Sequence, residues 1–171
     1  MKRGVAPIDL GSSSEVGALV RLYEIDEPAE LATQIVYLRD QWAEYQVEFS
    51  EIQLDFDCPS SRLLEYAQFI AELRPQLENL NIDLPISTTG LLTWLEDNPE
   101  GAEALGASVE YVAYQLYTNF DPLPNLKNYY PLIENIEYSY KIGISTSHGF
   151  DNITYPKNEN YYGQLIFLNV I

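Results

Sequence analysis

Two aspartates one residue apart, Asp55 and Asp57, are the side chains of this 171-residue sequence that most suggest chemistry. They end a segment, residues 52–57, in which apolar and polar residues alternate. This alternation predicts a β-strand with one apolar and one polar face, and Gln53 shares the polar face with both aspartates. Two carboxylates held close together resist being charged at the same time, which favours a proton on one of them. Glycoside hydrolysis uses such a proton donor together with a second group that stabilises the developing cation.

A structural interpretation of the same pair stays open. Both carboxylates extend from one strand, with α-carbons about 6.6 Å apart, so they do not flank a glycosidic bond easily. Arg21 and Lys141 lie on other predicted strands and would neutralise Asp55 in an ion-pair network. The sequence therefore allows either a catalytic pair or a structural network at this position.

The candidate site extends to the ends of other predicted strands. Tyr117 and Gln115 have the groups to hydrogen-bond a substrate, and Trp94 has the ring to stack on a sugar or to cap the barrel. We take Asp55, Asp57 and Tyr117 as the candidate catalytic residues. The candidate substrate-binding residues are Arg21, Tyr23, Gln53, Trp94, Gln115 and Lys141.

Six short strands must position these side chains. They are predicted at residues 19–23, 52–57, 84–89, 111–117, 138–145 and 165–169. Helices are predicted between them: one starts at Pro28, one is capped by Ser60 or Ser61, and one covers residues 130–133. Strands that begin about 30 residues apart are typical of repeated βα units in a parallel sheet.

The polar face that recurs on these strands distinguishes a barrel from an open sheet. An open parallel sheet is covered by helices on both faces, so its strands are almost wholly apolar. One polar face on most strands instead predicts a barrel with a polar lumen and its site at the strand ends. A complete (β/α)8 barrel has eight strands in about 250 residues. We therefore predict an α/β fold: a partial (β/α)8 TIM-type barrel of about six parallel strands that lacks its N-terminal units.

The domain organisation follows from the same strands. Residues 1–16 are predicted to be a loose lead-in, and residues 17–171 a single partial-barrel domain. The open side of such a barrel leaves unpaired strand edges, and these predict self-association.

The balance of charge excludes several classes of partner. The formal net charge is -17 and the sequence pI is about 4.1, so we expect no binding to nucleic acid. No apolar run is long enough to span a membrane, and the basic N-terminus is not followed by the apolar segment of a signal peptide. The chain is expected to be soluble, and the sequence leaves its compartment open.

No cofactor is expected. No glycine-rich phosphate loop follows any predicted strand. The single histidine, His148, cannot form a zinc cluster alone.

Five segments, in one order along the chain, give the sequence a resemblance to a known family. The most specific is IQLDFDCPSSRLLEY at residues 52–66; the others are LPISTTGLLTW at 84–94, YQLY at 114–117, YKIGI at 140–144 and GQLIFL at 163–168. Over residues 19–169 the chain resembles the uncharacterised bacterial domain-of-unknown-function family 3142. The resemblance implies a glycoside-hydrolase-like barrel with no established reaction. Members of the family usually begin with further strands.

A wider likeness is to the chitinase-type glycoside hydrolases, whose signature strand ends in alternating acidic residues. Asp55 and Asp57 match the last two aspartates of that pattern, and Pro59 stands where the catalytic glutamate would be. Tyr117 is similar in place to the lumen tyrosine of those enzymes. The likeness implies a carbohydrate in the polar lumen, with hydrolysis left open. The alternatives are a non-catalytic glycan-binding or scaffolding barrel and an inactive fragment of a longer protein.

Overall fold

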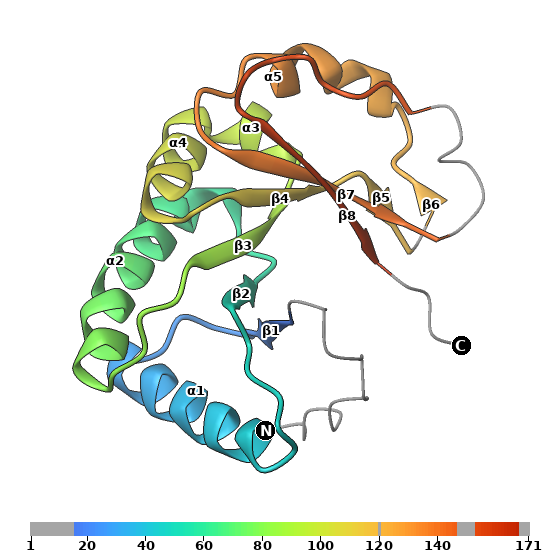
Figure 1. Ribbon diagram of the computed structural model, residues 1–171. Coiled ribbons are helices and arrows are strands. Elements are labelled where there is room, and N and C mark those ends of the chain that lie inside the picture. The colour runs from blue at the N-terminus through green and yellow to red at the C-terminus, as the bar shows by residue number, and fades with distance from the viewer. Residues whose placement is uncertain (1–15, 120, 147–152, 168–171) are drawn as a thin grey trace.

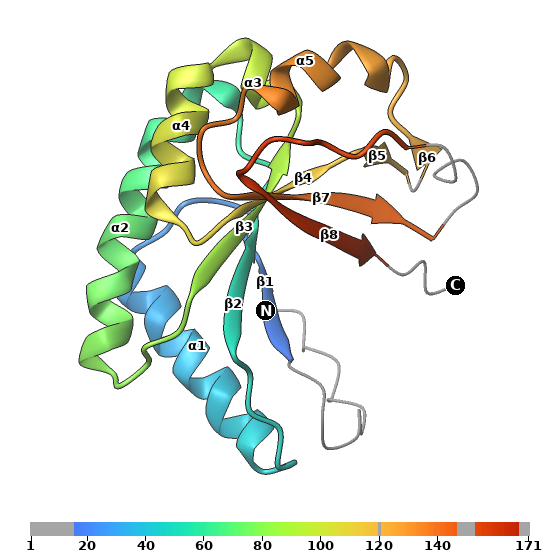
Figure 2. The ribbon, with the colours of Figure 1, turned by 45° about the horizontal axis from the view of Figure 1, so that its top comes forward.

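The computed structural model describes residues 16–119, 121–146 and 153–167. Six parallel strands form one sheet, in which each strand pairs with the next in the order β1-β2-β3-β4-β7-β8. The sheet curls into a half barrel (Figures 1 and 2), so the predicted α/β partial barrel of six parallel strands is confirmed. The strands are β1 Gly17–Arg21, β2 Glu51–Asp55, β3 Ile86–Leu91, β4 Val112–Gln115, β7 Tyr140–Ser145 and β8 Tyr161–Phe167.

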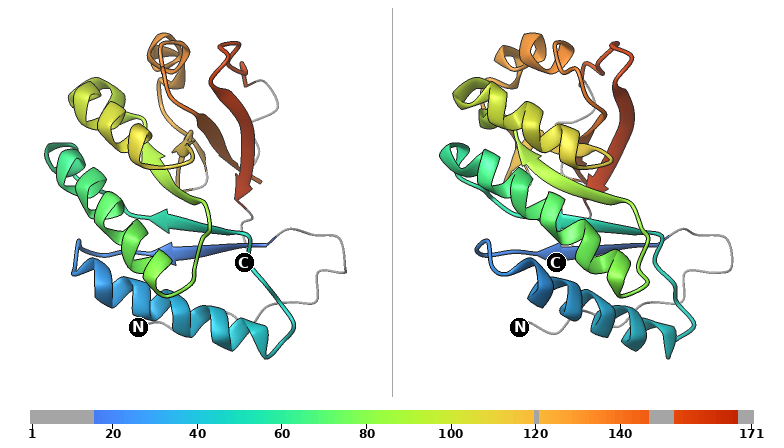
Figure 3. Two further views of the ribbon diagram at one scale, coloured as in Figure 1. Left: turned by 60° about the vertical axis from the view of Figure 1, so that its left-hand side comes forward. Right: turned by 90° about the vertical axis from the view of Figure 1, so that its left-hand side faces the viewer.

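Three long helices lie on one side of the sheet, as Figure 3 shows: α1 Pro28–Ala43, α2 Leu63–Asn79 and α4 Pro99–Ser108. The middle helix, α2, packs against both of the others. Two shorter helices, α3 Thr93–Asp97 and α5 Tyr130–Glu134, complete this layer, and α5 confirms the helix predicted at 130–133. Within the described ranges, none of the helices is long and apolar enough to cross a membrane.

The local sequence accounts for where the helices begin. Proline opens α1 at Pro28 and α4 at Pro99, where its missing N–H has no helical partner to lose. Asn98 caps α4 by accepting a 3.0 Å hydrogen bond from the Gly101 N–H. The predicted serine cap of α2 is wrong: a 3-10 turn, Ser60–Arg62, comes first, and the Ser60 hydroxyl donates to Asp97 instead.

Alternation along the strands divides the sheet into two faces. Ile52 and Leu54 of β2 are fully buried beneath the helices, and Gln53 and Asp55 lie on the opposite face. Thr88 of β3 also faces the helices, where the Tyr66 hydroxyl is 2.8 Å from its own. The predicted distinction between an apolar and a polar face is therefore confirmed on β2.

Several predicted strand boundaries are shifted in the structure. β3 continues through Gly90, where a Cβ atom would lie 2.6 Å from Val112, so only glycine fits against β4. The predicted strand 111–117 is two elements, because β4 is followed by a hairpin of β5 Tyr117–Thr118 and β6 Asp121–Pro122. β8 begins at Tyr161, four residues earlier than predicted, and Asn169 lies outside the described residues.

The two edges of the sheet are β1 and β8. The self-association that was expected through such edges stays a prediction.

Close packing between α4 and the segment before β7 leads to a stability prediction. A Cβ at Gly106 would lie 2.3 Å from the Tyr138 ring. Although alanine usually stabilises a helix by about 0.5–1 kcal/mol relative to glycine, Gly106→Ala should lower the free energy of unfolding by about 1–3 kcal/mol through overpacking. Chemical denaturation measures the change.

Gly17→Ala is the matched control, because a Cβ there meets only Glu51 atoms at 3.9 Å. It should change the free energy of unfolding by less than about 0.5 kcal/mol. A Gly106→Ala protein as stable as the unmodified chain would contradict the packing described here.

Candidate functional site

The candidate site lies on the inner face of the half barrel, which we define as the face of the sheet opposite α1, α2 and α4. No helix within the described ranges covers this face (Figures 2 and 3). Alternate residues of each strand project onto it, among them Arg21, Asp55, Thr89 and Lys141. Polar side chains therefore gather there because the strand period is two and only one face is buried under helices.

Arg21 bridges the two aspartates. Its Nη1 atom donates to Asp55 Oδ2 at 2.7 Å, and its Nη2 atom donates to Asp57 Oδ2. The second oxygen of Asp55 accepts a 2.7 Å hydrogen bond from the Thr89 hydroxyl. We call Arg21, Asp55, Asp57 and Thr89 the Arg21 cluster. It links the end of β1 to the ends of β2 and β3.

The electrostatics of the Arg21 cluster favour the charged form of the guanidinium. Partial burial lowers the pKa of the Arg21 guanidinium, but its hydrogen bonds to Asp55 and Asp57 and their negative charges outweigh this and raise the pKa overall. The Asp55 side chain is 15% exposed and that of Asp57 is 52% exposed. Asp57 is therefore the carboxylate of the pair that solvent and ligands reach more easily.

Tyr117 lies beside this cluster at the start of β5. Its ring packs against Phe167, with 5.5 Å between the ring centroids. Burial raises the pKa of Tyr117 to about 12, and the negative charges of Asp55 and Asp57 contribute to the increase. The structure thus brings the three candidate catalytic residues together, with the tyrosine hydroxyl neutral at ordinary pH.

A second polar group, the Glu51 cluster, lies on the same face towards the start of the strands. It consists of Glu51, Gln53, Ser87, Tyr111 and Lys141. The Tyr111 hydroxyl donates to Glu51 Oε1 at 2.5 Å, and the Ser87 hydroxyl donates to the same oxygen. Gln53 Nε2 donates to Ser87 at 3.2 Å. The Lys141 ammonium lies 3.8 Å from the centroid of the Tyr111 ring.

These contacts show which of the two basic residues, Arg21 or Lys141, neutralises Asp55. Arg21 neutralises Asp55, as the structural interpretation expected. The parallel expectation for Lys141 is wrong, because its ammonium lies over the Tyr111 ring.

Trp94 does not belong to the site. Its side chain is fully buried in the core, and its indole N–H donates to the Cys58 carbonyl at 2.8 Å. The predicted stacking of Trp94 on a sugar is wrong, because no face of the ring reaches the surface. Tyr23 lies just beyond β1 and is 78% exposed, and Gln115 is partly exposed at the end of β4.

Sequence reasoning missed four residues of the two clusters: Thr89, Glu51, Ser87 and Tyr111. Thr89 bonds to Asp55, Ser87 accepts from Gln53, and Tyr111 lies beneath Lys141, so each contacts a residue that had been identified. Among the described residues, Glu51 accepts only from Ser87 and Tyr111. Glu51 continues the alternation of Gln53 and Asp55 by one step, so extending the predicted strand would have found it. Thr89 is the last of three consecutive residues with hydroxyl groups, 87–89. Only the register of β3 shows which of these hydroxyls lie on the inner face and which one faces the helices.

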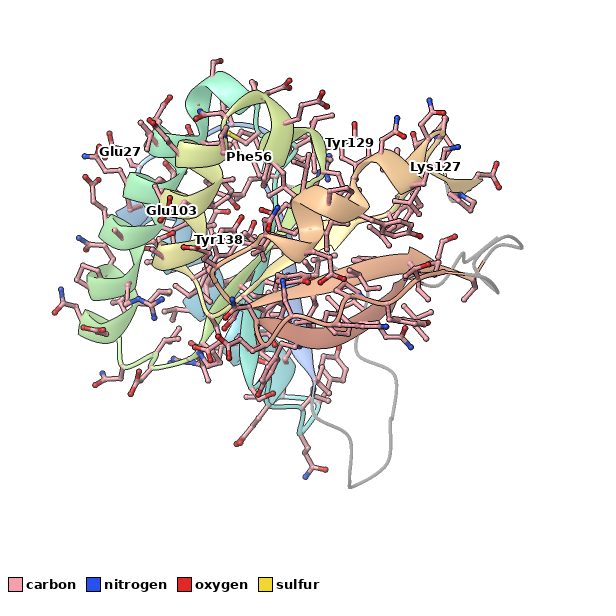
Figure 4. All side chains as sticks on the ribbon, turned by 90° about the horizontal axis from the view of Figure 1, so that it is seen from above. Glu27, Phe56, Glu103, Lys127, Tyr129 and Tyr138 are labelled. Carbon is pink, nitrogen blue, oxygen red and sulfur yellow. The ribbon has the colours of Figure 1, made fainter. Side chains whose placement is uncertain are left out.

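Two surface hollows lie elsewhere, on the helical side. One, of about 220 Å³, is lined by α4, α5 and the segment before β7, where Figure 4 shows Glu103 near Tyr138. The other, of about 250 Å³, lies between Pro28 and α2. Neither contains a residue of the two polar clusters. Among the described residues, no His, Cys, Asp and Glu side chains are grouped to hold a metal ion, and His148 lies outside those ranges.

Tyr117 offers a direct test of this geometry. Asp57→Asn removes one of two negative charges that raise its pKa, so the pKa should fall below about 12 but stay above its ordinary value because burial remains. Carbon-13 NMR of labelled tyrosines, titrated over the alkaline range, measures the change.

Tyr138 is the internal control. Burial and the charge of Glu103 raise its pKa to about 12, and Asp57 takes no part. Its titration should be the same in both proteins. An unchanged Tyr117 titration in Asp57→Asn would mean that the two side chains are not neighbours.

Comparison with known proteins places the chain in a family. A family model described as Domain of unknown function (DUF3142) matches residues 17–129. The matched region begins at β1 and contains the whole Arg21 cluster together with Tyr117. No curated protein and no solved structure matches the chain. Because the match covers well over half of the 171 residues, the chain belongs to the DUF3142 family.

Proposed function

We propose that the inner face binds a carbohydrate, with the Arg21 cluster at the centre of the site. The observation that carries the proposal is the bridge from Arg21 to both aspartates on a sheet face that the described helices leave uncovered. The cluster stands at the C-terminal ends of β1 and β2, the end at which parallel barrels bind their ligands. Its members hold one another in place, so little side-chain entropy is lost when a ligand binds.

The chemistry of the cluster suits a polyhydroxylated ligand. Each sugar hydroxyl is both a donor and an acceptor, and it needs charged or polar side chains of fixed direction. The exposed carboxylate of Asp57 accepts from such hydroxyls, and the neutral hydroxyl of Tyr117 can donate or accept. Since the chain carries a net charge of -17, long-range repulsion favours a neutral sugar over an anionic one.

The same contacts favour binding over hydrolysis. A glycosidase needs a carboxylic acid that donates a proton to the leaving oxygen. Asp55 and Asp57 instead accept hydrogen bonds from a guanidinium, which keeps its proton at all ordinary pH values. Both also extend from the β2 side of the site, and Pro59 stands where the chitinase-type pattern, which this strand resembles, would place the acid. We therefore propose a glycan-binding half barrel without turnover.

The test is binding and turnover on one panel of neutral oligosaccharides, by calorimetry and by release of reducing ends. The unmodified chain should bind at least one class and release no product. Asp57→Asn should weaken binding about tenfold or more, because a charge-assisted hydrogen bond is lost.

Asp40→Asn is the matched control. Asp40 also pairs with an arginine, Arg39, but on the helical layer, so its replacement should leave affinity unchanged. Absence of binding across the panel would refute the proposal. Product release that Asp57→Asn abolishes would show that the site is a hydrolase.

A further inference from the structure

Tyr162 on β8 is a large aromatic residue whose side chain is exposed to solvent. Its exposed fraction is 71%, although it lies within a paired strand. Because Trp94 is buried, it cannot stack on a ligand. An exposed ring next to the inner face could supply that contact for the function proposed above. The register between β7 and β8 explains how this ring reaches that face.

Tyr162 lies in a β-bulge and faces inwards. Tyr140 pairs with Tyr161 and Ile142 pairs with Gln164, so two residues, Tyr162 and Gly163, stand opposite the single residue Lys141. The rings of Tyr161 and Tyr140 lie 5.7 Å apart on the helical side. Successive residues point to opposite faces, so Tyr162 faces inwards. Bulges of this kind redirect side chains and are frequent beside functional sites.

Gly163 makes this bulge possible. Its φ angle is +120°, in a region that residues with a Cβ rarely adopt. The extra residue also reverses the alternation of the strand. After the bulge, Gln164 and Ile166 pair with residues of β7 that face the helical side of the sheet. The bulge thus lets β8 present two rings on the inner face, the exposed Tyr162 and, further along, Phe167 against Tyr117.

Lys141, a member of the Glu51 cluster, lies near two aromatic rings, Tyr111 and Tyr162. Its ammonium is 3.8 Å from the Tyr111 centroid and 5.6 Å from the Tyr162 centroid. Tyr111 is buried and Tyr162 is exposed. The ammonium group therefore lies beside the exposed Tyr162 ring and has three N–H donors.

Lys141 and the Arg21 cluster belong to one row across the sheet. Arg21 pairs with Asp55, the Asp55 carboxylate bonds to Thr89, Thr89 pairs with Ala113, and Ala113 pairs with Lys141. Neighbouring strands are about 4.8 Å apart, so the three steps from Asp55 to Lys141 cover about 14 Å along the sheet. A single pyranose ring does not span this row.

We propose that Tyr162 and Lys141 form a second subsite, in which a sugar ring stacks on Tyr162 while Lys141 donates to its hydroxyls. The inference rests on the proposed function and extends it: the ligand is a neutral oligosaccharide that runs from the Arg21 cluster to β8. The C–H face of a pyranose packs on an aromatic ring, and tyrosine offers this area with few rotatable bonds. The subsite lies outside residues 17–129, so it is a property of this chain rather than of the matched region.

The test compares affinity for a disaccharide and a tetrasaccharide of the class that the panel identifies. In the unmodified chain the tetrasaccharide should bind more tightly. Tyr162→Thr removes the ring but keeps a residue that favours strands, and it should abolish most of this advantage, up to about tenfold. Tyr162→Phe keeps the ring and should keep the advantage. Tyr37→Ala removes another exposed tyrosine, from α1 on the helical side, and should leave the advantage of the longer ligand unchanged.

The outcomes separate this inference from the proposed function. If Tyr162→Thr and the unmodified chain show the same length dependence while Asp57→Asn weakens binding, the subsite is refuted and the carbohydrate site stands. If no member of the panel binds to the unmodified chain, both fail. Should Tyr162→Thr be poorly folded by circular dichroism, Lys141→Met tests the same subsite and should also reduce the advantage of the longer ligand.

Discussion

One-sided coverage by helices is the constraint on which this structure depends. Because α1, α2 and α4 all lie on one side, Ile52 and Leu54 must face them, and the residues between must face the other way. The inner face therefore carries polar groups that have to satisfy one another. Within the described part of the chain, every buried side-chain nitrogen and oxygen atom has a hydrogen-bond partner. The Arg21 and Glu51 clusters are the means by which the inner face meets this requirement.

Arg21 joins stability and the proposed function in one interaction. Its guanidinium ties the edge strand β1 to the end of β2 and keeps two neighbouring carboxylates from repelling each other. The same contact occupies oxygens that a hydrolase would use to hold a proton. In the function proposed above, the fixed carboxylates would accept hydrogen bonds from ligand hydroxyls, whereas glycosidic cleavage would need a carboxylic acid that donates a proton. The proposal of binding without turnover rests on this neutralisation of the pair.

Part of the fold and of the candidate site could be predicted from the sequence, and particular residues show why the rest could not. The period of two on residues 52–57 placed Gln53, Asp55 and Asp57 on one face, and the regular spacing of strands indicated a parallel half barrel. The prediction for Trp94 was wrong because the residue lies in the short helix α3, where strand periodicity does not indicate side-chain direction. Its ring is buried in the core. Tyr162 was out of reach because one bulge residue changes the phase of β8, and a bulge leaves no periodic signal.

The sequence by itself determined the fold class, the order of its strands and which face of β2 is polar, because these follow from local periodicity and the chain's own connectivity. Only the tertiary structure decided which polar groups are partners. Arg21 and Asp55 are 34 residues apart, and Thr89 is another 34 residues further on, so their contacts depend on strand register. Register is set by packing across the whole sheet. For that reason the neutralised carboxylates, the placement of Lys141 over Tyr111 and the inward turn of Tyr162 belong to the folded chain alone.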